Sequence, residues 1–591
     1  SAFAPDALGR HFDEVEAADL VVLWRAAWDE RVAAVVATAR RHRARIAYDI
    51  DDLVFDPTLA RVETIDGIRS QGLAPGEVAE RYSLQRRTAL AADFCTASTA
   101  ELARALRRLG KPAWVLPNGF DEATFAASRL AARRRRRERT DDLLRIGYAG
   151  GTRTHQQDFR ACATALARVL QAHPQVRLVL FRDSRARPLL DPLEYPELAR
   201  HRRQIEWRDE VPLAALPAEL ARFDINLAPL EAGNPYCEAK SELKHFEAAL
   251  AGVCTIASPT GPFARAISDG VTGRLAGHDD AWQAAVEQLV AAPEARAGLA
   301  AQALRVSLWR FGPERRVALA AGLLERLCGE HAAARADALA IGLADERFAV
   351  PRVPEASVEF DHDSLVAADA TVVLAIDGDV DRVVATLESC AAQRQAALDL
   401  VLCGSADAGG PIRDWLAVHA SRFGRARLLT VAPAEEGAML ALDAAIDAAD
   451  TWQVLWISAG ARLAPGAVES MLAALRESGA AALYVVRSPL LHRAPVLDWP
   501  LAMAIGSPAL LLGKGGWSAT GGLGALAAEA ASVLLRCRLV ERGLPAAAIA
   551  AAHVLDCSGT CSDAPDTDGG ALRSVAALVR RAHPWVELDL D

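Results

Sequence analysis

A chain of 591 residues is too long for a single hydrophobic core, and typical domain sizes predict three or four domains. The composition, 52% hydrophobic and 24% charged, is that of a globular protein, and no apolar run is long enough to cross a membrane. A net charge of −10 argues against a nucleic-acid binder, which normally carries a basic face, and the ten cysteines show no metal-like clustering.

Residues 1–126 are predicted to form a small α/β domain. Apolar runs indicate strands at 20–25, 45–49, 93–98 and 113–119, with an amphipathic helix at 28–40. Strands that alternate with helices imply a parallel sheet, which binds its ligands at the carboxyl ends of the strands. Arg25, Asp51 and Asp52 fall at these ends and are candidate site residues, although helix capping or a salt bridge would also explain the two acids.

Residues 127–142 are predicted to be a linker because they hold five consecutive arginines at 133–137. A solvated connector is the simplest interpretation of this run. Contact with anionic lipid or with a phosphorylated ligand is the alternative.

Residues 143–328 are predicted to form a second α/β domain, in which residues 234–253 read as a polar loop, a helix and an apolar strand. Leu243, Phe246 and Leu250 form the apolar stripe of the helix, and Glu247 lies beside it. A carboxylate in such surroundings has to be paired, hydrogen-bonded or used. Lys240 and Ser241 lie near the helix start, where backbone N–H groups favour an anion.

The pattern Lys240-Ser241-x-x-Lys244-x-x-Glu247-Ala248-Ala249-x-x-Gly252 resembles the donor-binding helix of family 4 glycosyltransferases of the GT-B fold. Three further segments support the resemblance in the expected order: a strand and glycine turn at 144–152, a strand at 224–230 and the turn at 269–275. Residues 1–126 resemble the acceptor domain of the same fold, without its first strand or two.

The resemblance implies a nucleotide-sugar site. Its donor-binding residues would be Gly150, Gly151, Thr152, Arg153, His155, Lys240, Ser241, Lys244 and Glu247, and its catalytic residues Arg25, Asp51 and Asp52. Purely structural roles are the alternatives to ligand binding: the glycines would form an ordinary strand-to-helix turn, and Glu247 would form an ion pair with Lys244 three residues before it. The family's Glu-x7-Glu motif lacks its first acid here, because Ala239 occupies that position.

After a second linker at 329–366, residues 367–591 are predicted to form a third α/β domain, which resembles a family 2 glycosyltransferase of the GT-A fold. In that family an Asp-x-Asp holds a divalent metal, but this chain has Ser458-Ala459-Gly460. A second expected acid is replaced by Cys403-Gly404, and an acidic pair by Glu529-Ala530. We expect a degenerate domain with a structural, dimerising or docking role.

The expected fold class is therefore α/β, with two Rossmann-like domains of the GT-B type and a GT-A-like third domain. We expect a retaining glycosyltransferase that needs no metal or other cofactor and moves a sugar from a nucleoside-diphosphate-sugar to a hydroxyl of a glycan, lipid-linked or protein acceptor. The alternatives are a non-catalytic scaffold and a sugar-nucleotide epimerase. The expected location is the cytoplasm, and any peripheral membrane association is expected at the inner membrane face. The third domain is the expected site of homo-oligomerisation.

Overall fold

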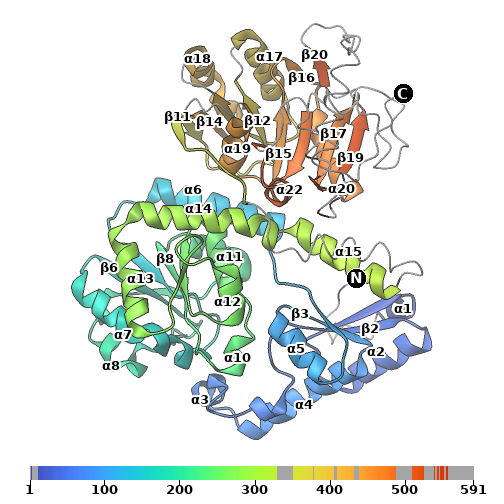
Figure 1. Cartoon of the computed structure of the whole chain (residues 1–591), viewed down its shortest axis with the longest axis vertical. Coiled ribbons are helices and arrows are strands. Elements are labelled where there is room, and N and C mark those ends of the chain that lie inside the picture. Colours follow the sequence, from blue (N-terminus) through green and yellow to red (C-terminus); the bar gives the residue numbers. More distant parts are fainter. Residues whose placement is uncertain are drawn as a thin grey trace. The chain divides into compact units, whose positions relative to one another are not determined.

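The chain is described from a computed structural model (Figure 1). It describes residues 11–328, 350–376, 379–404, 409–431, 438–486, 509–524, 546–550 and 554–556, and single positions 2, 535, 538, 539, 542 and 544. Two compact units are present, Ser1–Gly119 with Arg135–Leu304, and Phe120–Arg134 with Arg305–Asp591. We call residues 11–119 the first lobe and 135–304 the second lobe of unit 1, and the residues from 350 onward the C-terminal domain of unit 2.

The first lobe contains a four-stranded parallel sheet, as the sequence predicts, and its strand order is β1-β2-β3-β4. Its strands are β1 (Leu20–Trp24), β2 (Arg45–Ile50), β3 (Phe94–Ala97) and β4 (Ala113–Val115). Its helices are α1 (Phe12–Glu16), α2 (Glu30–Arg41), α3 (Asp66–Gln71), α4 (Pro75–Ala91) and α5 (Ala100–Arg108), with a 3₁₀ turn at Pro57–Leu59. Asp29 and Thr99 fix the starts of α2 and α5 because their side chains accept backbone N–H groups of the first turn.

The second lobe contains a six-stranded parallel sheet in the order β10-β9-β8-β5-β6-β7. Its strands are β5 (Leu144–Gly147), β6 (Val176–Arg182), β7 (Ile205–Asp209), β8 (Ile225–Ala228), β9 (Cys254–Ala257) and β10 (Arg274–Leu275). The chain extends the sheet from β5 to one side and then returns to place β8 on the other side. Parallel sheets bind ligands at such a switch point, beyond the carboxyl ends of the two strands.

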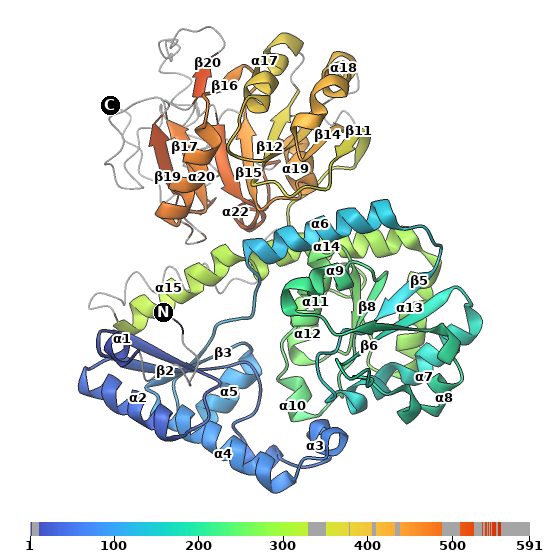
Figure 2. The same cartoon turned by 180° about the vertical axis from the view of Figure 1, so that it is seen from behind.

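The helices of the second lobe cover this sheet, and Figure 2 shows α11 beside β8. They are α7 (Gln156–Ala172), α8 (Pro196–Ala199), α9 (Leu216–Leu220), α10 (Pro235–Glu238), α11 (Leu243–Leu250), α12 (Gly261–Ala266) and α13 (Asp279–Ala291), with 3₁₀ turns at Pro192–Glu194, Arg202–Gln204 and Leu213–Ala215. α14 (Pro293–Arg310) begins in this lobe and continues into unit 2. Phe159, Leu178 and Trp282 belong to the buried core between helices and sheet.

The arginine run lies in a helix, α6 (Glu122–Glu138), and two of its members are not solvated as expected. Arg133 is 3% exposed and forms ion pairs with Asp363 and with Asp399, at 3.6 Å from the latter. Arg135 forms an ion pair with Asp224 at 2.9 Å. The expectation of an exposed connector is therefore wrong at these positions, because carboxylates of the surrounding protein hold the guanidinium groups.

The C-terminal domain contains an eight-stranded mixed sheet in the order β11-β14-β13-β12-β15-β18-β17-β19 and a two-stranded ladder of β16 and β20. The strands are β11 (Ala356–Asp363), β12 (Ala370–Ala375), β13 (Leu398–Gly404), β14 (Arg425–Val431), β15 (Gln453–Ile457), β16 (Ala461–Leu463), β17 (Ala482–Val486), β18 (Ala509–Gly513), β19 (Ala546–Ala550) and β20 (Val554–Asp556). The helices of unit 2 from residue 305 onward are α15 (Pro313–Cys328), α17 (Val380–Ala391), α18 (Gly409–His419), α19 (Ala438–Ala448), α20 (Ala467–Ser478) and α22 (Lys514–Ala519), with a 3₁₀ turn at Ala420–Arg422.

β12 to β15 form a parallel block, whereas β18 runs antiparallel to β15. The predicted loss at Glu529-Ala530 lies outside the described residues. In the described part of the chain, no helix is long and apolar enough to span a bilayer.

Candidate functional site

A cavity of about 310 Å³ opens at the switch point of the second lobe. Ala149, Gly150 and Gly151 reach it from the turn after β5, and Asn226 reaches it from β8. Leu243, Lys244 and Glu247 line it from α11, whereas Phe246 and Leu250 of the same helix are buried in the core. Burial of Phe246 and Leu250 thus fixes the rotation of α11 and turns Lys244 and Glu247 toward the cavity, together with Leu243, the third member of the apolar stripe.

The rest of the lining is apolar except for Glu210, and it was not anticipated from the sequence. Its apolar residues are Phe181 from β6, Val211 and Leu213 after β7, and Leu216 and Leu220 of α9. Leu213 is 78% exposed, so an apolar side chain stands in solvent at the cavity mouth. The signal that could have identified these residues is their place at or after the carboxyl ends of β6 and β7.

Lys244 and Glu247 are charged side chains in a poorly solvated place. The Lys244 ammonium donates to the carbonyl oxygen of Ala149 and lies 5.2 Å from the ring centroid of Tyr148. Burial lowers the pKa of Lys244 to about 8 and raises the pKa of Glu247 to about 7, although each charge partly offsets the shift of the other. The Glu247 carboxylate has no hydrogen bond within the described residues and lines the cavity, so it is open to a ligand's donors.

The glycine turn after β5 brings only two of its five predicted site residues to the cavity. A Cβ atom at Gly151 would meet nothing within 4 Å, so the protein's own packing leaves space there. The Thr152 hydroxyl pairs with that of Thr154 at 2.7 Å. Arg153 donates to the carbonyl of Pro188, and His155 pairs with Asp158 at 2.8 Å. Thr152, Arg153 and His155 therefore have partners inside the protein and do not line the cavity.

Lys240 and Ser241 precede α11 and contact the first lobe instead. The Lys240 ammonium lies 3.9 Å from an Asp52 oxygen and 4.8 Å from the ring centroid of Tyr236. The Asn118 amide donates to the Ser241 hydroxyl at 2.9 Å. The two lobes of unit 1 thus meet where the sequence predicts phosphate-binding and catalytic residues.

Arg25, Asp51 and Asp52 come together at the carboxyl ends of β1 and β2. The Arg25 guanidinium lies 3.0 Å from Asp51 and 3.4 Å from Asp52. Arg25 has a φ of 45°, a left-handed conformation that costs a non-glycine residue about 1 kcal/mol or more. A hydrogen bond from Gln85 to its carbonyl and one from its N–H to Asp49 hold that conformation.

No neighbouring acid replaces the one missing at Ala239, whose side chain is buried. Glu238, the adjacent acid, accepts the N–H groups of Gly233 and Gly261 and so ties two loops together. The acid next to Ala239 is therefore used in contacts within the protein and does not take the place of the missing acid.

Asp158, near the start of α7, is a buried acid that the sequence reading missed. It accepts hydrogen bonds from the Cys237 thiol at 3.0 Å and the Glu231 N–H at 3.2 Å, besides pairing with His155. Burial alone would raise the pKa of Asp158, but the His155 and Cys237 hydrogen bonds hold it below its usual value. Burial lowers the pKa of His155. The hydrogen bonds from Glu231 and Cys237 to Asp158 fix the segment before α11.

The sequence of the second lobe matches a known family. Residues 144–292 match a family model described as Glycosyl transferases group 1. This stretch holds the glycine turn and α11 and is similar to the domains of that family, and the expected enzyme class, a glycosyltransferase, is confirmed. No match was found among curated proteins.

Several solved structures resemble the chain at low sequence identity. HepE of Anabaena, solved with UDP-glucose, is 17% identical, with coverage of 54% of this chain and 81% of that one and a TM-score of 0.38. Sucrose-phosphate synthase of Thermosynechococcus elongatus is 17% identical, with coverage of 55% and 77% and a TM-score of 0.37. WaaG, a glycosyltransferase involved in lipopolysaccharide biosynthesis, is 14% identical, with coverage of 51% and 90% and a TM-score of 0.34. These scores carry no conclusion about substrate or reaction.

Proposed function

We propose that the chain transfers a sugar from a nucleoside-diphosphate-sugar to a hydroxyl acceptor at the switch-point cavity of unit 1. The observation that carries the proposal is one cavity with two chemically different ends. An apolar wall of Phe181, Val211 and Leu216 suits the flat face of a base. The open carboxylate of Glu247 suits the two hydroxyls of a ribose, which are paired donors.

The leaving diphosphate would lie toward the start of α11, near Lys240, Ser241 and the backbone of Gly150 and Gly151. Free N–H groups at a helix start and a nearby ammonium stabilise an anion, and they do so without a metal. Lys244 adds charge at the same end of the cavity. The proposal assigns donor binding to these residues, and to Thr152, Arg153 and His155 only a supporting role in the turn.

On the acceptor side, Asp51 and Asp52 would orient the attacking hydroxyl or accept its proton. Arg25 lies beside both carboxylates, and Lys240 lies beside that of Asp52. Retention of configuration and the nature of the acceptor, whether glycan, lipid-linked or protein, follow from the family resemblance and are part of the proposal.

For the C-terminal domain we propose a degenerate GT-A-like role without catalysis. The segment Ser458-Ala459-Gly460 follows β15 and lies against the guanidinium group of Arg382. Arg382 donates to the Ala459 carbonyl at 2.9 Å, and a Cβ atom at Gly460 would meet its Nε at 2.7 Å. A cation in contact with this turn does not suit a second, divalent cation. Within the described residues, no group of three or more His, Cys, Asp or Glu side chains has metal-binding geometry.

A non-catalytic, nucleotide-sugar-binding scaffold is the second candidate, and the missing acid at Ala239 favours it. Such a protein would bind the donor but neither transfer nor hydrolyse its sugar. A sugar-nucleotide epimerase would instead convert the free nucleotide sugar without an acceptor.

The test is thermal unfolding of the full chain with UDP, GDP, ADP, TDP or CMP, each with and without Mg²⁺. A nucleotide at one hundred times its dissociation constant stabilises the protein by about 2.7 kcal/mol. We expect one diphosphate to stabilise the wild type without metal and to bind Glu247→Ala about 10- to 100-fold more weakly, since a hydrogen bond to a charged group contributes about 1.5–3 kcal/mol. Glu294→Ala, which removes an exposed acid on α14, is the control. Binding that requires Mg²⁺ and is unaffected by Glu247→Ala would contradict the proposed site.

A further inference from the structure

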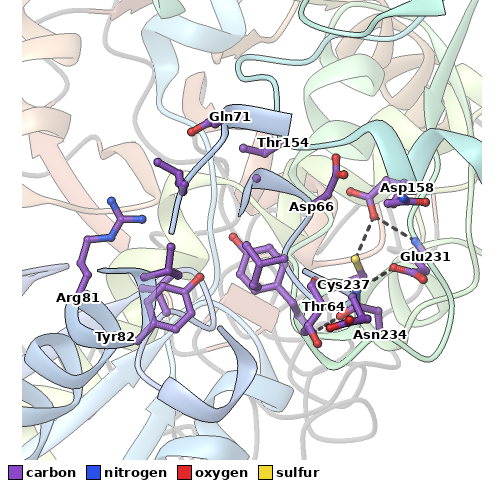
Figure 3. A pocket seen from close by; sticks show the side chains of 18 of the residues that line it. Thr64, Asp66, Gln71, Arg81, Tyr82, Thr154, Asp158, Glu231, Asn234 and Cys237 are labelled. Carbon is purple, nitrogen blue, oxygen red and sulfur yellow. Dashed lines mark hydrogen bonds between the residues drawn. The ribbon is translucent and has the colours of Figure 1, made fainter. Parts of the chain in front are cut away.

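A second cavity, of about 150 Å³, lies between the first and second lobes of unit 1 (Figure 3). It shares no lining residue with the switch-point cavity. The first lobe lines it mainly with α3, α4 and the segment just before α3, and the second lobe lines it with α7, α10 and the segments that precede these two helices. Its volume corresponds to about five water molecules at about 30 Å³ each, which leaves room for one small ring but not for a nucleotide.

Several polar groups on the second-lobe side of this cavity are already engaged (Figure 3). Asp158 accepts from Cys237 and from the N–H of Glu231. The Asn234 amide donates to the carbonyl of Thr64 at 2.9 Å and to Glu231 at 2.8 Å. These bonds shape the wall and leave little capacity for a ligand on that side.

Tyr82 of α4 is the exception, because it is 3% exposed yet its hydroxyl has no hydrogen bond within the described residues. Tyr236 of α10, on the facing side, also lines the cavity and has a hydroxyl without a protein partner in the described part of the chain. Burial raises the pKa of both phenols, so both hydroxyls stay protonated and act as donors. Neither hydroxyl is among the enclosed polar atoms without a partner, so both are accessible from the cavity that they line and can donate to an oxygen atom of a ligand there.

The remaining lining is apolar on one side and polar at the mouth. Ile65, Val78 and Tyr82 belong to a small apolar cluster, with Leu73 and Tyr236 packed against it. Glu63 and Arg81 are exposed residues of the lining. A ligand that fits has an apolar face to lie on aromatic rings and oxygen atoms around its edge. A sugar ring has both, since its C–H bonds point to the faces and its hydroxyls point outward.

We propose that this interlobe pocket binds the terminal sugar ring of the acceptor, with Tyr82 and Tyr236 as hydrogen-bond donors. The assignment rests on the proposed function. The pocket adjoins the predicted catalytic groups, because Arg25 lines it and pairs with Asp51 and Asp52. The ring of Tyr236 also lies beneath Lys240. A sugar here would thus present a hydroxyl next to the groups that the transfer requires.

The test is saturation-transfer NMR on the full chain with methyl α- and β-pyranosides of glucose, galactose and mannose, at saturating concentration of the nucleoside diphosphate that binds best. The variants are Tyr82→Phe, Tyr236→Phe and the double substitution, each of which removes only hydroxyl groups. Tyr195→Phe is the control, since its hydroxyl donates to the Gln156 carbonyl outside both cavities. Thermal unfolding checks that every variant is folded.

We expect at least one pyranoside to bind the wild type together with the nucleotide, and each Tyr→Phe change in the pocket to weaken it about 3- to 10-fold. Nucleotide affinity should stay the same in these variants. The proposal is overturned if no pyranoside binds while the nucleotide does, or if binding is insensitive to the double substitution. It is also overturned if the substitutions weaken a nucleotide sugar but not its nucleoside diphosphate, because the pocket would then hold the donor's sugar. Failure of every nucleotide to bind would instead refute the proposed function.

Discussion

Single residues in the switch-point cavity show how burial and charge compete. Glu247 and Lys244 lie one helical turn apart on α11, yet burial shifts the pKa of each toward its neutral form. The i−3 pair with Lys244 that the sequence left open as an alternative therefore does not fully compensate the cost of burial. A carboxylate held in this way gains most from a ligand that supplies hydroxyl donors.

The pH dependence of nucleotide binding follows from this residue. Glu247 has a pKa of about 7 without ligand, and ribose hydroxyls would lower that pKa because they donate to the ionised form. Affinity should therefore fall as the pH drops through about 7, and it should also fall as the pH rises through about 8, where Lys244 loses its charge, so the maximum is expected between about pH 7 and 8. Isothermal titration calorimetry from about pH 6 to 8 measures this trend, in buffers of different ionisation enthalpy to count the protons. Glu247→Gln should remove the component due to this group; an unchanged profile in that variant would contradict the assignment.

At the scale of elements, α6 shows that identical residues in one run can differ in burial and in their ion-pair partners. Arg133 and Arg134 are adjacent in sequence, but Arg133 is buried against Asp363 and Asp399 whereas Arg134 is exposed. Arg425 joins the same network through Asp450 at 2.7 Å. The network lies within unit 2 and holds α6 to the C-terminal domain.

Replacing Arg133 by Ala should destabilise unit 2 by about 3–5 kcal/mol, because it removes the ion pair of the buried Asp399 and one of the ion pairs of Asp363. Arg134→Ala is the matched control, and its effect should stay within about 0.5 kcal/mol. Urea unfolding of both full-length variants compares them. Similar unfolding midpoints for the two would show that the buried network contributes little to stability.

At the scale of the whole molecule, unit 2 carries buried acids that should make its stability depend on pH. Burial raises the pKa of Glu314 on α15 to about 8, although the Trp452 indole donates to it at 2.9 Å. Burial also raises the pKa of Asp399 to about 7 and that of Asp443 to about 6. Since each folded-state pKa lies above its unfolded value, the folded state binds protons more tightly and is favoured at lower pH.

We therefore expect unit 2 to lose stability as the pH rises from about 5 to about 8, by on the order of a few kcal/mol for Glu314. Glu314→Gln keeps the acceptor for Trp452 and should make the profile flatter. Chemical unfolding at several pH values tests this, with the nucleotide-stabilised transition of unit 1 as an internal reference. A stability that rises with pH over this range would contradict the expectation.

The sequence by itself determined the local structure and the broad class. The parallel sheet of the first lobe, the loop–helix–strand order around α11 and the side of that helix that carries Glu247 all follow from apolar periodicity, which depends on near neighbours only. The enzyme class came from a motif of the same short range, now matched over residues 144–292. Because periodicity also fixes which face is buried, Phe246 and Leu250 could be assigned to the core correctly.

The tertiary structure decided which of these residues meet. It separated Gly150 and Glu247, which line the cavity, from Arg153 and His155, which bind the protein itself. It also brought Lys240 to Asp52 and placed Tyr82 and Tyr236, which are far apart in the sequence, in the lining of one cavity. Contacts of this kind depend on the order of the strands in a sheet and on which carboxylate, distant in sequence, forms an ion pair with a given guanidinium group. Sequence spacing does not encode either, so only the folded chain distinguishes a ligand-binding charge from one that another part of the protein neutralises.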